Sequence, residues 1–500
     1  MDLAAGRETS PATVADILER LGPVIGQVSV LGDAAVGIVA VEHDHRALRP
    51  AVSPGGRGTL YCCLRGALHD GHDHAAEARA SGAVAFLCER DLGAAAGGAP
   101  QLVVPPGEGR RAMALAACVV ERDPARSLAT VGVTGTNGKT TTTHLLVSIL
   151  SAAGYEAGLV GTLSGQRTTP EANELQRRLA AAAAAARSAG RPGAVAMEVT
   201  SHALVQHRVD GYVHDVAVFT NLSQDHLDYH GTMEAYFEAK ASLFTPEHAR
   251  RGVVNADDAY GRRLLERQGI ETSPFSLADA GGLSLSADES RFVLRGQEVR
   301  LGLIGLFNVE NALAAAAAAR ALGVDDAVVA EGLSRAPTVP GRLEPVENAL
   351  GLRVLVDYAH TPDGLSQACA AVRDLLGEHS RLLVVFGAGG DRDHDKRPLM
   401  GSAVSAAADV AVVTTDNPRH EDPEEIMAAV ARGCTGPAEL RLEADRRVAI
   451  GLALSLAGPG DLVLVAGKGH ETTQQVGDEF HSFDDRLVVA EEASRLAGAP

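Results

Sequence analysis

The 500-residue chain lacks several features that define special classes of protein. No apolar run approaches the roughly 18 residues of a membrane-spanning helix, and the first residues have neither the basic start nor the apolar stretch of a secretory signal. We therefore expect a cytoplasmic protein without a membrane span. The six cysteines include no C-x-x-C pair, which favours reduced, structural thiols over a metal knuckle. The net charge of -19 excludes a nucleic-acid groove, because such a surface repels a polyanion.

Lysine is also scarce. Only four of the 45 basic residues are lysine, namely Lys139, Lys240, Lys396 and Lys468. Because the chain uses arginine wherever any positive charge serves, a remaining lysine indicates a position that needs a compact ammonium or a nucleophilic amine. The alternative is that four surface lysines fell at these positions by chance.

The order of apolar runs predicts the fold class. At about 150 residues per domain, the length indicates about three domains. Strand-like runs alternate with helical stretches, which is typical of α/β domains with parallel sheets. The runs lie at 36–41, 59–64, 84–87, 129–133, 194–197, 216–220, 252–255, 353–356, 382–386, 410–414 and 461–465. Segments rich in Pro and Gly at 105–107 and 337–341 predict the domains 1–107, 108–339 and 340–500.

A glycine-rich loop follows the strand predicted at 129–133. Residues 134–141 read T-G-T-N-G-K-T-T and open an apolar-periodic helix. In this context, backbone amides cradle phosphates, Lys139 reaches the terminal phosphates, and Thr140 is suited to bind Mg²⁺. Val133 stands where the complete phosphate-loop pattern has its first glycine, and the alternative is a chance Gly-Lys-Thr turn.

Three further features of the middle region carry side chains suited to ligand binding or catalysis. Glu198 ends a predicted buried strand, where open α/β sheets place ligands, although a lone glutamate there is usually solvated. Residues 225–230 contain four acid or imidazole side chains, suited to a hard cation or equally to a plain polar loop. Lys240 lies on a predicted amphipathic helix at 233–240, where an isolated lysine is normally exposed.

Two turns of the C-terminal region present cations. The segment 387–398 is a glycine turn followed by clustered charge, a suitable carboxylate or phosphate clamp. The turn D-N-P-R at 416–419 presents an amide and a guanidinium, which suit bidentate recognition of an amino-acid carboxylate. The alternative is a helix-initiating turn, because residues 422–425 carry a capping pattern for the next helix.

These motifs together resemble the Mur ligases, the ATP-dependent amide-forming enzymes of peptidoglycan synthesis. The resemblance implies an N-terminal uridine-nucleotide-binding α/β domain, a central phosphate-loop ATPase domain with a parallel sheet, and a C-terminal Rossmann-like domain. It implies ATP as co-substrate and Mg²⁺ as cofactor, with catalytic roles for Lys139, Glu198, His226 and Lys240. The implied metal ligands are Thr140, Glu198, His226 and Lys240, the last as a carbamate formed with carbon dioxide.

The resemblance also implies a set of nucleotide contacts. The implied ATP-binding residues are Gly135, Thr136, Asn137, Gly138, Lys139, Thr140, Thr141, Asn308, Arg342, Asp357 and His360. An alternative role for Asn308 is to cap the helix that begins nearby.

The D-N-P-R turn resembles that of the diaminopimelate-adding members of the family. The implied reaction couples meso-2,6-diaminopimelate to UDP-N-acetylmuramoyl-L-alanyl-D-glutamate through an acyl phosphate, with Arg419 binding the distal carboxylate that lysine lacks. The implied amino-acid ligands are Arg392, Asp416, Asn417, Pro418, Arg419, Gly467 and Glu471. The implied ligands of the uridine-nucleotide substrate are His45, Arg46, Thr168, Thr169, Thr200, Gln206 and Arg208. His45 departs from the usual serine of D-S-R, which puts the uracil contact in doubt, and Thr200 replaces a serine but keeps its hydroxyl.

Other interpretations remain. A lysine-adding ligase would bring the lysine ammonium against Arg419, and a divergent ligase would use another acceptor. A polyglutamate-type synthetase would not need D-N-P-R. A nucleotide-binding paralogue without activity would have no reason to keep Lys139, Glu198, His226 and Lys240 together. For all of them we expect small-molecule partners, no nucleic acid and a monomer.

Overall fold

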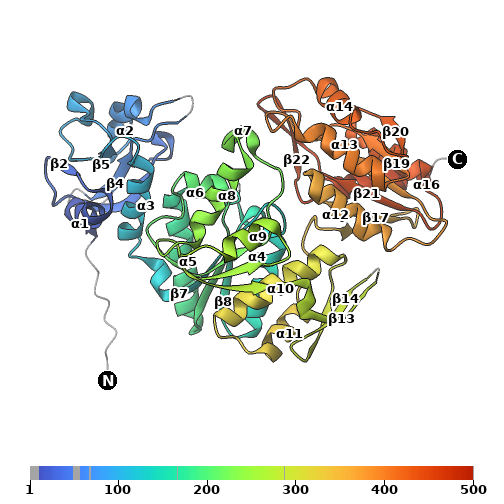
Figure 1. Cartoon of the computed structure of the whole chain (residues 1–500). Helices are drawn as coiled ribbons and strands as arrows, with labels where there is room; N and C mark the ends of the chain where they lie inside the picture. The colour runs from blue at the N-terminus through green and yellow to red at the C-terminus, as the bar shows by residue number, and fades with distance from the viewer. Residues whose placement is uncertain (1–10, 49–56, 67–68, 166, 287, 499–500) are drawn as a thin grey trace. The chain divides into compact units, whose positions relative to one another are not determined.

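The computed structural model describes residues 11–48, 57–66, 69–165, 167–286 and 288–498 (Figure 1). The chain forms two compact units. Unit 1 comprises residues 1–132, 154–217 and 242–250, and unit 2 comprises 133–153, 218–241 and 251–500. Among the described helices, none combines the length and apolar composition that crossing a bilayer requires.

The N-terminal part of unit 1 is built on a six-stranded sheet. The strand order is β1-β3-β4-β5-β6-β2, in which β3 to β6 run parallel and the two edge strands run antiparallel. Its elements are β1 (Ala12–Thr13), α1 (Val14–Ile25), β2 (Ser29–Leu31), β3 (Gly37–Glu42), η1 (His45–Ala47), β4 (Gly58–Cys62), η2 (Gly71–His74), α2 (Ala75–Ala80), β5 (Ala83–Cys88), η3 (Gly93–Ala96), β6 (Gln101–Val103), α3 (Gly109–Val120) and η4 (Pro124–Ser127).

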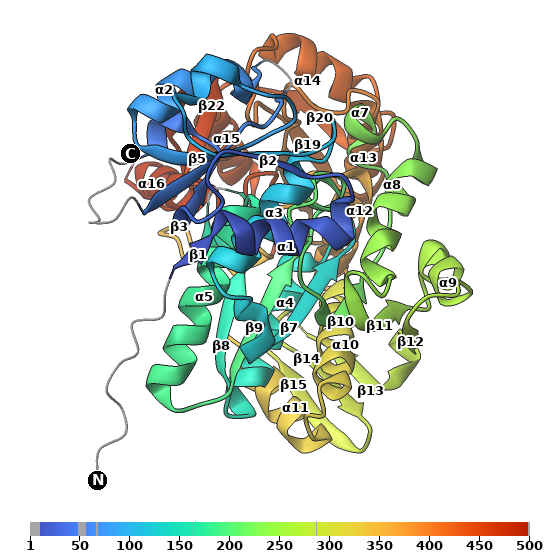
Figure 2. The same cartoon turned by 90° about the vertical axis from the view of Figure 1, so that its left-hand side faces the viewer.

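Helices cover both faces of this sheet. Apolar residues of α1 and α3 share one buried core with alternate residues of β3, β4 and β5, and Figure 2 shows these two helices side by side. Residues of α2 form a second core with the other face. Helix α3 follows the boundary predicted at residue 107, yet it packs on the N-terminal sheet. The domain boundaries stay predictions.

A second six-stranded sheet forms the middle of the chain, in the order β12-β11-β10-β7-β9-β8. Its strands β7, β10 and β11 begin in unit 1 and end in unit 2. The elements of this region are β7 (Leu128–Thr134), α4 (Lys139–Ala152), β8 (Glu156–Val160), η5 (Thr162–Ser164), α5 (Ala172–Ala189), β9 (Gly193–Glu198), α6 (Ser201–Val205), β10 (His214–Phe219), α7 (Leu227–His230), α8 (Met233–Ala241), η6 (Ser242–Phe244), β11 (Ala249–Asn255), α9 (Ala259–Leu265), β12 (Glu271–Phe275), η7 (Leu277–Asp279), β13 (Ala280–Leu285), β14 (Ser290–Leu294), β15 (Gln297–Leu301), α10 (Leu306–Ala321) and α11 (Asp326–Ser334).

The C-terminal part of unit 2 has a third six-stranded sheet, in the order β16-β17-β21-β18-β19-β20. All its neighbouring strands are parallel except β16, which pairs antiparallel with β17. The elements are β16 (Glu344–Pro345), β17 (Arg353–Asp357), α12 (Pro362–Arg373), β18 (Leu382–Phe386), α13 (Lys396–Ala407), β19 (Val410–Val413), α14 (Pro423–Ala431), β20 (Glu439–Leu442), α15 (Arg446–Leu456), β21 (Leu462–Ala466), β22 (Thr473–Val476), β23 (Glu479–Ser482) and α16 (Asp485–Ala497).

Local sequence explains why these C-terminal elements form. Every residue of β18 is buried, as expected for a strand covered on both faces. One face packs against α12, α13 and α14, and the other against α15 and α16. Helix α14 begins with Pro423 after the cap Asp422, whose side chain accepts a hydrogen bond from the amide of Glu424. The predicted capping pattern is therefore confirmed.

The prediction of an α/β protein with parallel sheets is confirmed, and each predicted apolar run overlaps an observed strand. The edge strands of all three large sheets, β1, β2, β8, β12, β16 and β20, were not predicted. They are short or largely unburied, so they lack the apolar runs that identify a central strand.

All six cysteines are free, in agreement with the expectation of reduced thiols.

Candidate active site

The glycine-rich loop of unit 2 is held against the segment that follows β10. The amide of Thr136 donates to the Asn221 carbonyl at 3.0 Å, and the amide of Asn137 donates to Asn221 Oδ1 at 2.9 Å. Thr220 Oγ1 in turn donates to the Asn137 carbonyl at 2.7 Å. A Cβ on Gly135 would lie 1.9 Å from Thr220 Oγ1, so only glycine fits at this point of the loop.

Two lysines meet at the start of this loop. Lys139 Nζ donates to the carbonyls of Gly135 and Thr136 at 2.9 and 2.8 Å, and Lys240 Nζ donates to the same Gly135 carbonyl at 2.7 Å. Lys240 is buried, and its ammonium lies 4.6 Å from the centre of the Tyr236 ring. Burial, together with the charge of Lys139, holds the pKa of Lys240 well below its ordinary value. The alternative of an exposed surface lysine is therefore wrong.

The acidic and imidazole cluster at 225–230 connects to the C-terminal part of unit 2. His226 has a left-handed backbone (φ 56°), and its Nε2 lies 3.3 Å from Asp225 Oδ2. Asp225 is buried and pairs with Lys396 Nζ at 3.1 Å. Burial alone would raise the pKa of Asp225, but the charges of Lys396 and the nearby imidazoles outweigh burial and lower it. Asp225 is thus part of a buried ion pair with Lys396, whereas Asp228 of the same segment is exposed.

Arg342 and Asp357 lie near the loop in unit 2. Arg342 Nη2 donates to Thr140 Oγ1 at 2.9 Å, and its guanidinium stacks 4.7 Å from the centre of the Tyr358 ring. Asp357, at the end of β17, accepts backbone hydrogen bonds from Leu343 and Ala359, both at 2.7 Å. Burial raises the pKa of Asp357. Asp357 therefore fixes the backbone at Leu343, the residue next to Arg342.

His360 and Asn308 complete the residues predicted for nucleotide binding. Burial and the charge of Lys396 lower the pKa of His360 to about 4, so its imidazole is neutral at pH 7. Asn308 is buried within α10, where its Nδ2 donates to the Ile304 carbonyl at 2.8 Å. The alternative that Asn308 caps this helix is wrong, because the cap is Gly305.

Five of the residues predicted to bind the uridine-nucleotide substrate form one network in unit 1. Thr169 Oγ1 donates to the Glu198 carbonyl at 2.8 Å and lies 3.3 Å from Thr200 Oγ1. Arg208 donates to the Thr169 carbonyl at 2.8 Å and to Gln206 Oε1 at 2.7 Å. The fifth, Thr168, shares a 3.0 Å hydroxyl contact with Thr162 Oγ1, which also donates to Glu198 Oε2 at 3.2 Å.

Glu198 stands at the end of β9, as predicted, but it is buried rather than solvated. Its Oε1 accepts from the amide of Thr162 at 2.8 Å. A Cβ on Gly161 would lie 2.3 Å from this oxygen, so the close approach of backbone and carboxylate needs a glycine.

His45 and Arg46, also predicted for the uridine-nucleotide substrate, contact neighbours in the N-terminal part of unit 1. The ring of His45 stacks on that of His74, with centres 4.6 Å apart, and its Nε2 lies 3.3 Å from Glu77 Oε2. Arg46 forms a bidentate pair with Asp44, both contacts at 2.9 Å. One ligand atom from each of His45, His74 and Glu77 lies within 4.8 Å of the other two, so these three side chains could together hold a metal ion.

The D-N-P-R turn contacts the chain after β21. Asn417 Nδ2 donates to Asp416 Oδ1 at 3.0 Å and to Glu471 Oε2 at 2.9 Å. Asp416 Oδ2 is buried and has no hydrogen-bond partner among the described residues. A Cβ on Gly467 would lie 2.6 Å from this oxygen, which explains the glycine there. The structure thus brings together four of the residues predicted to bind the amino acid.

The guanidinium of Arg419 and the aliphatic part of the Arg392 side chain lie beside Gly389 in the same region. A Cβ on Gly389 would lie 3.0 Å from Arg419 Nη1 and 4.0 Å from Arg392 Cγ. Arg419 donates to the Gly390 carbonyl at 2.6 Å, and the carbonyl of Pro418 closely faces Gly390. Burial, with the charge of Arg392, lowers the pKa of Arg419. Two cations near one glycine turn are suited to a carboxylate ligand.

Some residues of these clusters were not predicted. Thr220 and Asn221 hold the glycine-rich loop, and Gln475 donates its backbone amide to Asn417 Oδ1 at 2.9 Å. Asp225 and Lys396 were each singled out in the sequence, but their pairing was not predicted. Lysine scarcity was a signal for Lys396. A glutamine on a short strand such as β22 carries no local signal of its position.

The donor groups fit the predicted cofactor in kind. A buried carboxylate (Glu198), an imidazole (His226) and a hydroxyl (Thr140) are present, and Lys240 is an amine whose lowered pKa favours the neutral form that reacts with carbon dioxide. Oxygen donors are those that Mg²⁺ prefers.

Comparisons with known proteins agree with this geometry. The model of the Mur ligase middle domain matches residues 133–319, and that of the Mur ligase, glutamate ligase domain matches residues 341–469. The UDP-N-acetylmuramoyl-L-alanyl-D-glutamate--2,6-diaminopimelate ligase of Streptomyces coelicolor is 42% identical, over 93% of this chain and 94% of its own. The ligase of the same name from Geobacillus thermodenitrificans is 41% identical, over 90% and 94%. A solved structure with that name is 31% identical with a TM-score of 0.62, over 95% of this chain and 99% of its own.

Proposed function

The chain belongs to the Mur ligase family, and on that premise we propose that it adds meso-2,6-diaminopimelate to UDP-N-acetylmuramoyl-L-alanyl-D-glutamate in peptidoglycan precursor synthesis. It is an ATP-dependent ligase that forms an amide bond and releases ADP and phosphate. The observation that carries this function is identity above 40% along nearly the whole chain to ligases of that reaction.

The chemistry has two steps. The γ-phosphoryl group of ATP passes to a γ-carboxylate oxygen of the D-glutamyl residue, and ADP leaves. The amine nitrogen of the amino acid then attacks the carbonyl carbon, phosphate leaves, and the nitrogen gives up a proton. The N-terminus of α4, directly after the loop, and the ammonium of Lys139 bind the phosphates of ATP, where they offset negative charge during the transfer. Domain closure would exclude water from the acyl phosphate.

Arg342, Asp357, His360 and Asn308 bind the nucleotide in this proposal. The contact between Arg342 and Thr140 Oγ1 supports it, because it brings a guanidinium to the first turn of the helix that follows the phosphate loop. The neutral His360 offers a hydrogen-bonding group without adding charge.

The Mg²⁺ ligands in this proposal are Thr140, Glu198, His226 and Lys240 as its carbamate. Bound Mg²⁺ supplies positive charge that stabilises the transferring phosphoryl group. The lowered pKa of Lys240 supports the carbamate, because only the neutral amine adds to carbon dioxide. A carbamate is a carboxylate-like anion, so the modification turns a buried amine into a metal ligand.

The amino acid binds at the D-N-P-R turn. Arg392 and Arg419 receive its distal carboxylate, and Asp416 Oδ2 accepts a hydrogen bond from its ammonium group. The positive charges of Arg419, whose guanidinium lies beside Gly389, and of the neighbouring Arg392 support this choice over lysine, which has an ammonium in place of that carboxylate. Pro418, Gly467 and Glu471 complete this site.

The uridine-nucleotide substrate contacts Thr168, Thr169, Thr200, Gln206 and Arg208, with His45 and Arg46 at its nucleotide end. The hydrogen-bond network in unit 1 supports the first five as one surface. ATP is a cytoplasmic metabolite, which supports a cytoplasmic reaction, and we propose a monomer as the working form.

The test is phosphate release from ATP by the purified protein with the uridine-nucleotide dipeptide. Parallel reactions contain meso-diaminopimelate, L-lysine or no amino acid. Release that depends on diaminopimelate alone is the expected result. Release with lysine would overturn the role of Arg419, and no release in any reaction would favour another acceptor or the inactive paralogue.

A further inference from the structure

Lys468 is a buried cation that the proposed mechanism does not use. It follows β21 in the segment Gly467-Lys468-Gly469, and it is 0% exposed. Its Nζ donates to Asn417 Oδ1 at 3.3 Å, to Glu471 Oε2 at 3.1 Å and to the Thr473 carbonyl at 2.6 Å. An ammonium has three N–H groups, so these three acceptors use all of them.

The contact with Asn417 determines how that amide is oriented. Asn417 Oδ1 accepts hydrogen bonds from Lys468 Nζ and from the backbone amide of Gln475. Asn417 Nδ2 donates to Asp416 Oδ1 and to Glu471 Oε2. A side-chain amide has two acceptor positions and two donor hydrogens, so the protein satisfies all four. Because Lys468 and the Gln475 amide are donors, the oxygen must face them and the NH₂ group must face the two carboxylates.

Charge explains why a cation is needed at this point. Asp416 and Glu471 both accept from the same NH₂ group, which brings two carboxylates close together. Lys468 is the cation in direct contact with Glu471. Without that ammonium, repulsion between the carboxylates would favour rotation of Glu471 away from Asn417.

We propose that Lys468 is a positioning residue for the amino-acid substrate. Through its contacts it holds Asn417 and Glu471 in the orientation that binds diaminopimelate, and this role rests on the function proposed above. The three acceptors converge on one point, which suits a compact ammonium, whereas a planar guanidinium directs its N–H groups outward in a fork. This explains why position 468 has lysine rather than arginine, although only four of the 45 basic residues in the chain are lysine.

The experiment compares Lys468→Met with the wild-type enzyme by steady-state phosphate release. Methionine keeps the length of the side chain but removes the charge. We expect the KM for diaminopimelate to rise about 10-fold or more, while the KM values for ATP and for the uridine-nucleotide dipeptide change less than about twofold. An unchanged KM for diaminopimelate, or an equal rise in all three KM values, contradicts the proposal.

A matched variant separates positioning from loss of stability. Val489→Ala removes buried volume from α16, in the C-terminal core, without a polar change near Asn417. We expect it to lower the Tm while leaving the KM for diaminopimelate within about twofold. A rise in KM like that of Lys468→Met would show that instability alone accounts for the effect.

Two further variants test the route of action. If Lys468 acts partly through Glu471, Lys468→Met raises KM less in the Glu471→Gln background than in the wild type. Fully additive effects would contradict this. Lys468→Arg is expected to raise KM selectively as well, and a wild-type KM would overturn the requirement for an ammonium.

The wild-type enzyme in the same assay separates the two proposals. If wild type shows no amino-acid-dependent release, the proposed function fails and the role of Lys468 fails with it. If wild type depends on diaminopimelate and Lys468→Met matches it in every KM, only the role of Lys468 is overturned.

Discussion

Burial changes the chemistry of single lysines in this protein. Lys240, Lys396 and Lys468 are 1%, 5% and 0% exposed, so the chance placement of surface lysines is wrong for these three. Each has a different partner: the Gly135 carbonyl, the Asp225 carboxylate, and the three acceptors around Asn417. Among the described residues, no carboxylate contacts Lys240 directly, and burial together with the charge of Lys139 lowers its pKa. The contacts of each lysine therefore distinguish Lys240, a candidate reactive amine, from Lys396 and Lys468, which are cations paired with carboxylates.

The first residue-scale prediction concerns Lys240. Lys240→Arg should lower kcat about 100-fold or more, because a guanidinium does not form the carbamate that the mechanism needs. Carbon-13 NMR of wild type with labelled bicarbonate should show a carbamate signal that the variant lacks. Glu238→Gln, on the exposed face of the same helix, is the control and should keep near-normal kcat. A fully active Lys240→Arg would remove the carbamate from the mechanism.

The second residue-scale prediction concerns Arg419. Arg419→Lys should raise the KM for diaminopimelate about 10-fold to 100-fold, because one ammonium replaces a bidentate guanidinium contact with a carboxylate. The exposed Arg432→Lys should leave that KM unchanged. Steady-state kinetics with diaminopimelate decides the matter, and equal KM values for the two variants would refute the assignment.

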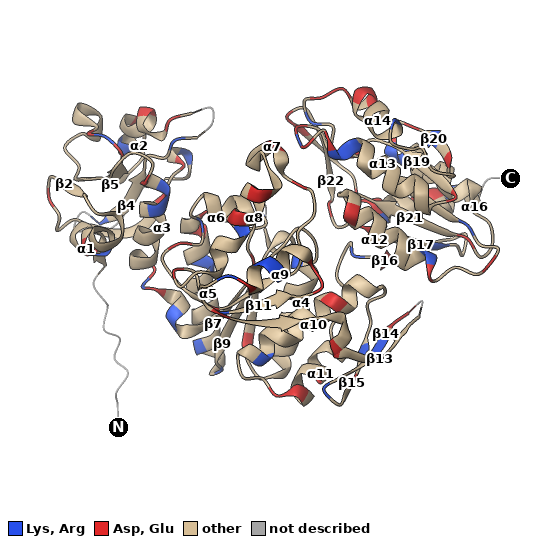
Figure 3. Ribbon diagram, viewed as in Figure 1, with Lys and Arg blue, Asp and Glu red and all other residues tan. Residues whose placement is uncertain are grey.

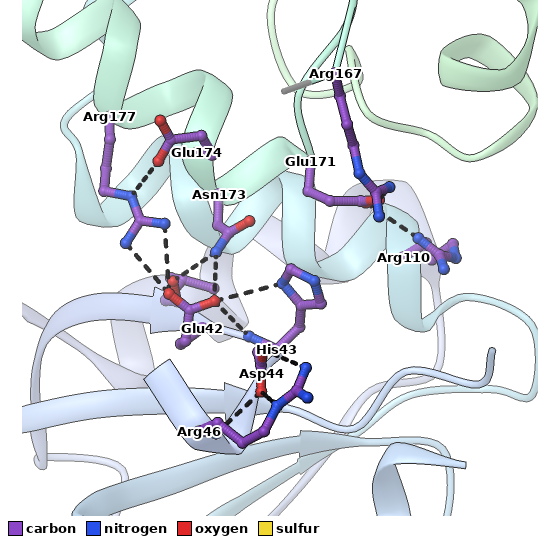
Figure 4. A network of polar contacts seen from close by, with 11 residues as sticks. Glu42, His43, Asp44, Arg46, Arg110, Arg167, Glu171, Asn173, Glu174 and Arg177 are labelled. Atoms are coloured by element: carbon purple, nitrogen blue, oxygen red, sulfur yellow. Dashed lines mark hydrogen bonds and ion pairs between the residues drawn. The ribbon is translucent and has the colours of Figure 1, made fainter. Parts of the chain in front are cut away.

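At the scale of elements, β3 and α5 are linked by one carboxylate within unit 1. Figure 4 shows Glu42, the last residue of β3, facing Asn173 and Arg177 of α5. Asn173 Nδ2 donates to Glu42 Oε1 at 3.1 Å, and Arg177 Nη1 lies 3.3 Å from Glu42 Oε2. Burial alone would raise the pKa of Glu42, but its hydrogen bonds with His43 and the charge of Arg177 outweigh burial and lower it to about 2. The strand thereby gains a charged contact with the helix that follows the Thr168 and Thr169 segment.

This contact predicts a pH-dependent stability. Since the folded pKa of Glu42 lies below the unfolded value, its contribution is complete above about pH 4.5 and is lost as pH falls toward about 2. Glu42→Gln should cost about 1–3 kcal/mol at pH 7, and the difference from wild type should shrink below pH 4.5. Thermal unfolding across this range measures it. Glu174→Gln, a more exposed carboxylate on α5, should cost under about 0.5 kcal/mol.

The phosphate loop provides the second prediction at this scale. Gly138 has φ 85°, and a Cβ there would lie 2.2 Å from Asn311 Oδ1. Gly138→Ala should raise the KM for ATP about 10-fold, because the loop must move away from Asn311. Gly154 has φ 89° with nothing within 4 Å of its Cβ position, so Gly154→Ala carries the same backbone strain without the clash. A normal KM for Gly138→Ala, or an equal rise for Gly154→Ala, would contradict the steric argument.

For the whole molecule, the apolar residues that form the cores differ from the polar and charged residues proposed for catalysis. The cores of the N-terminal and C-terminal sheets are apolar and belong to separate parts of the chain. Figure 3 shows acidic and basic residues interspersed along the ribbon, although the net charge is -19. In the proposed function, anionic substrates are bound by local groups such as Lys139, Arg342 and Arg419, against the overall charge.

Metal removal should affect these two properties differently. With EDTA, amino-acid-dependent phosphate release should stop, and added Mg²⁺ should restore it. The Tm without ligands should shift by less than about 2 °C, because the apolar cores need no metal. Activity that persists in EDTA would contradict the proposed cofactor, and a large fall in Tm would indicate a structural metal instead.

Local sequence was sufficient wherever one segment makes a feature by itself. The loop 134–141 was identified because its glycines, lysine and threonines are consecutive, and central strands were identified because they are continuous apolar runs. The network of Asn417, Lys468 and Gln475 could not be predicted as a network, because Asn417 is 51 and 58 residues from the other two and meets them only when β21 and β22 are in place. The antiparallel sheet β13–β15 was not predicted either, because strands such as β14 alternate buried and exposed residues over five positions only.

The sequence by itself determined the α/β class, the order of the central strands along the chain, the glycine-rich loop and the family, because each depends on residues adjacent in the chain or on identity along it. Only the tertiary structure decided that Lys240, Glu198 and Lys468 are buried, that Arg342 contacts Thr140, and that Asn417 has every hydrogen-bonding position satisfied. These properties depend on packing between distant segments. Burial changes the free energy of a charge, and an amino-acid sequence read locally contains no measure of burial.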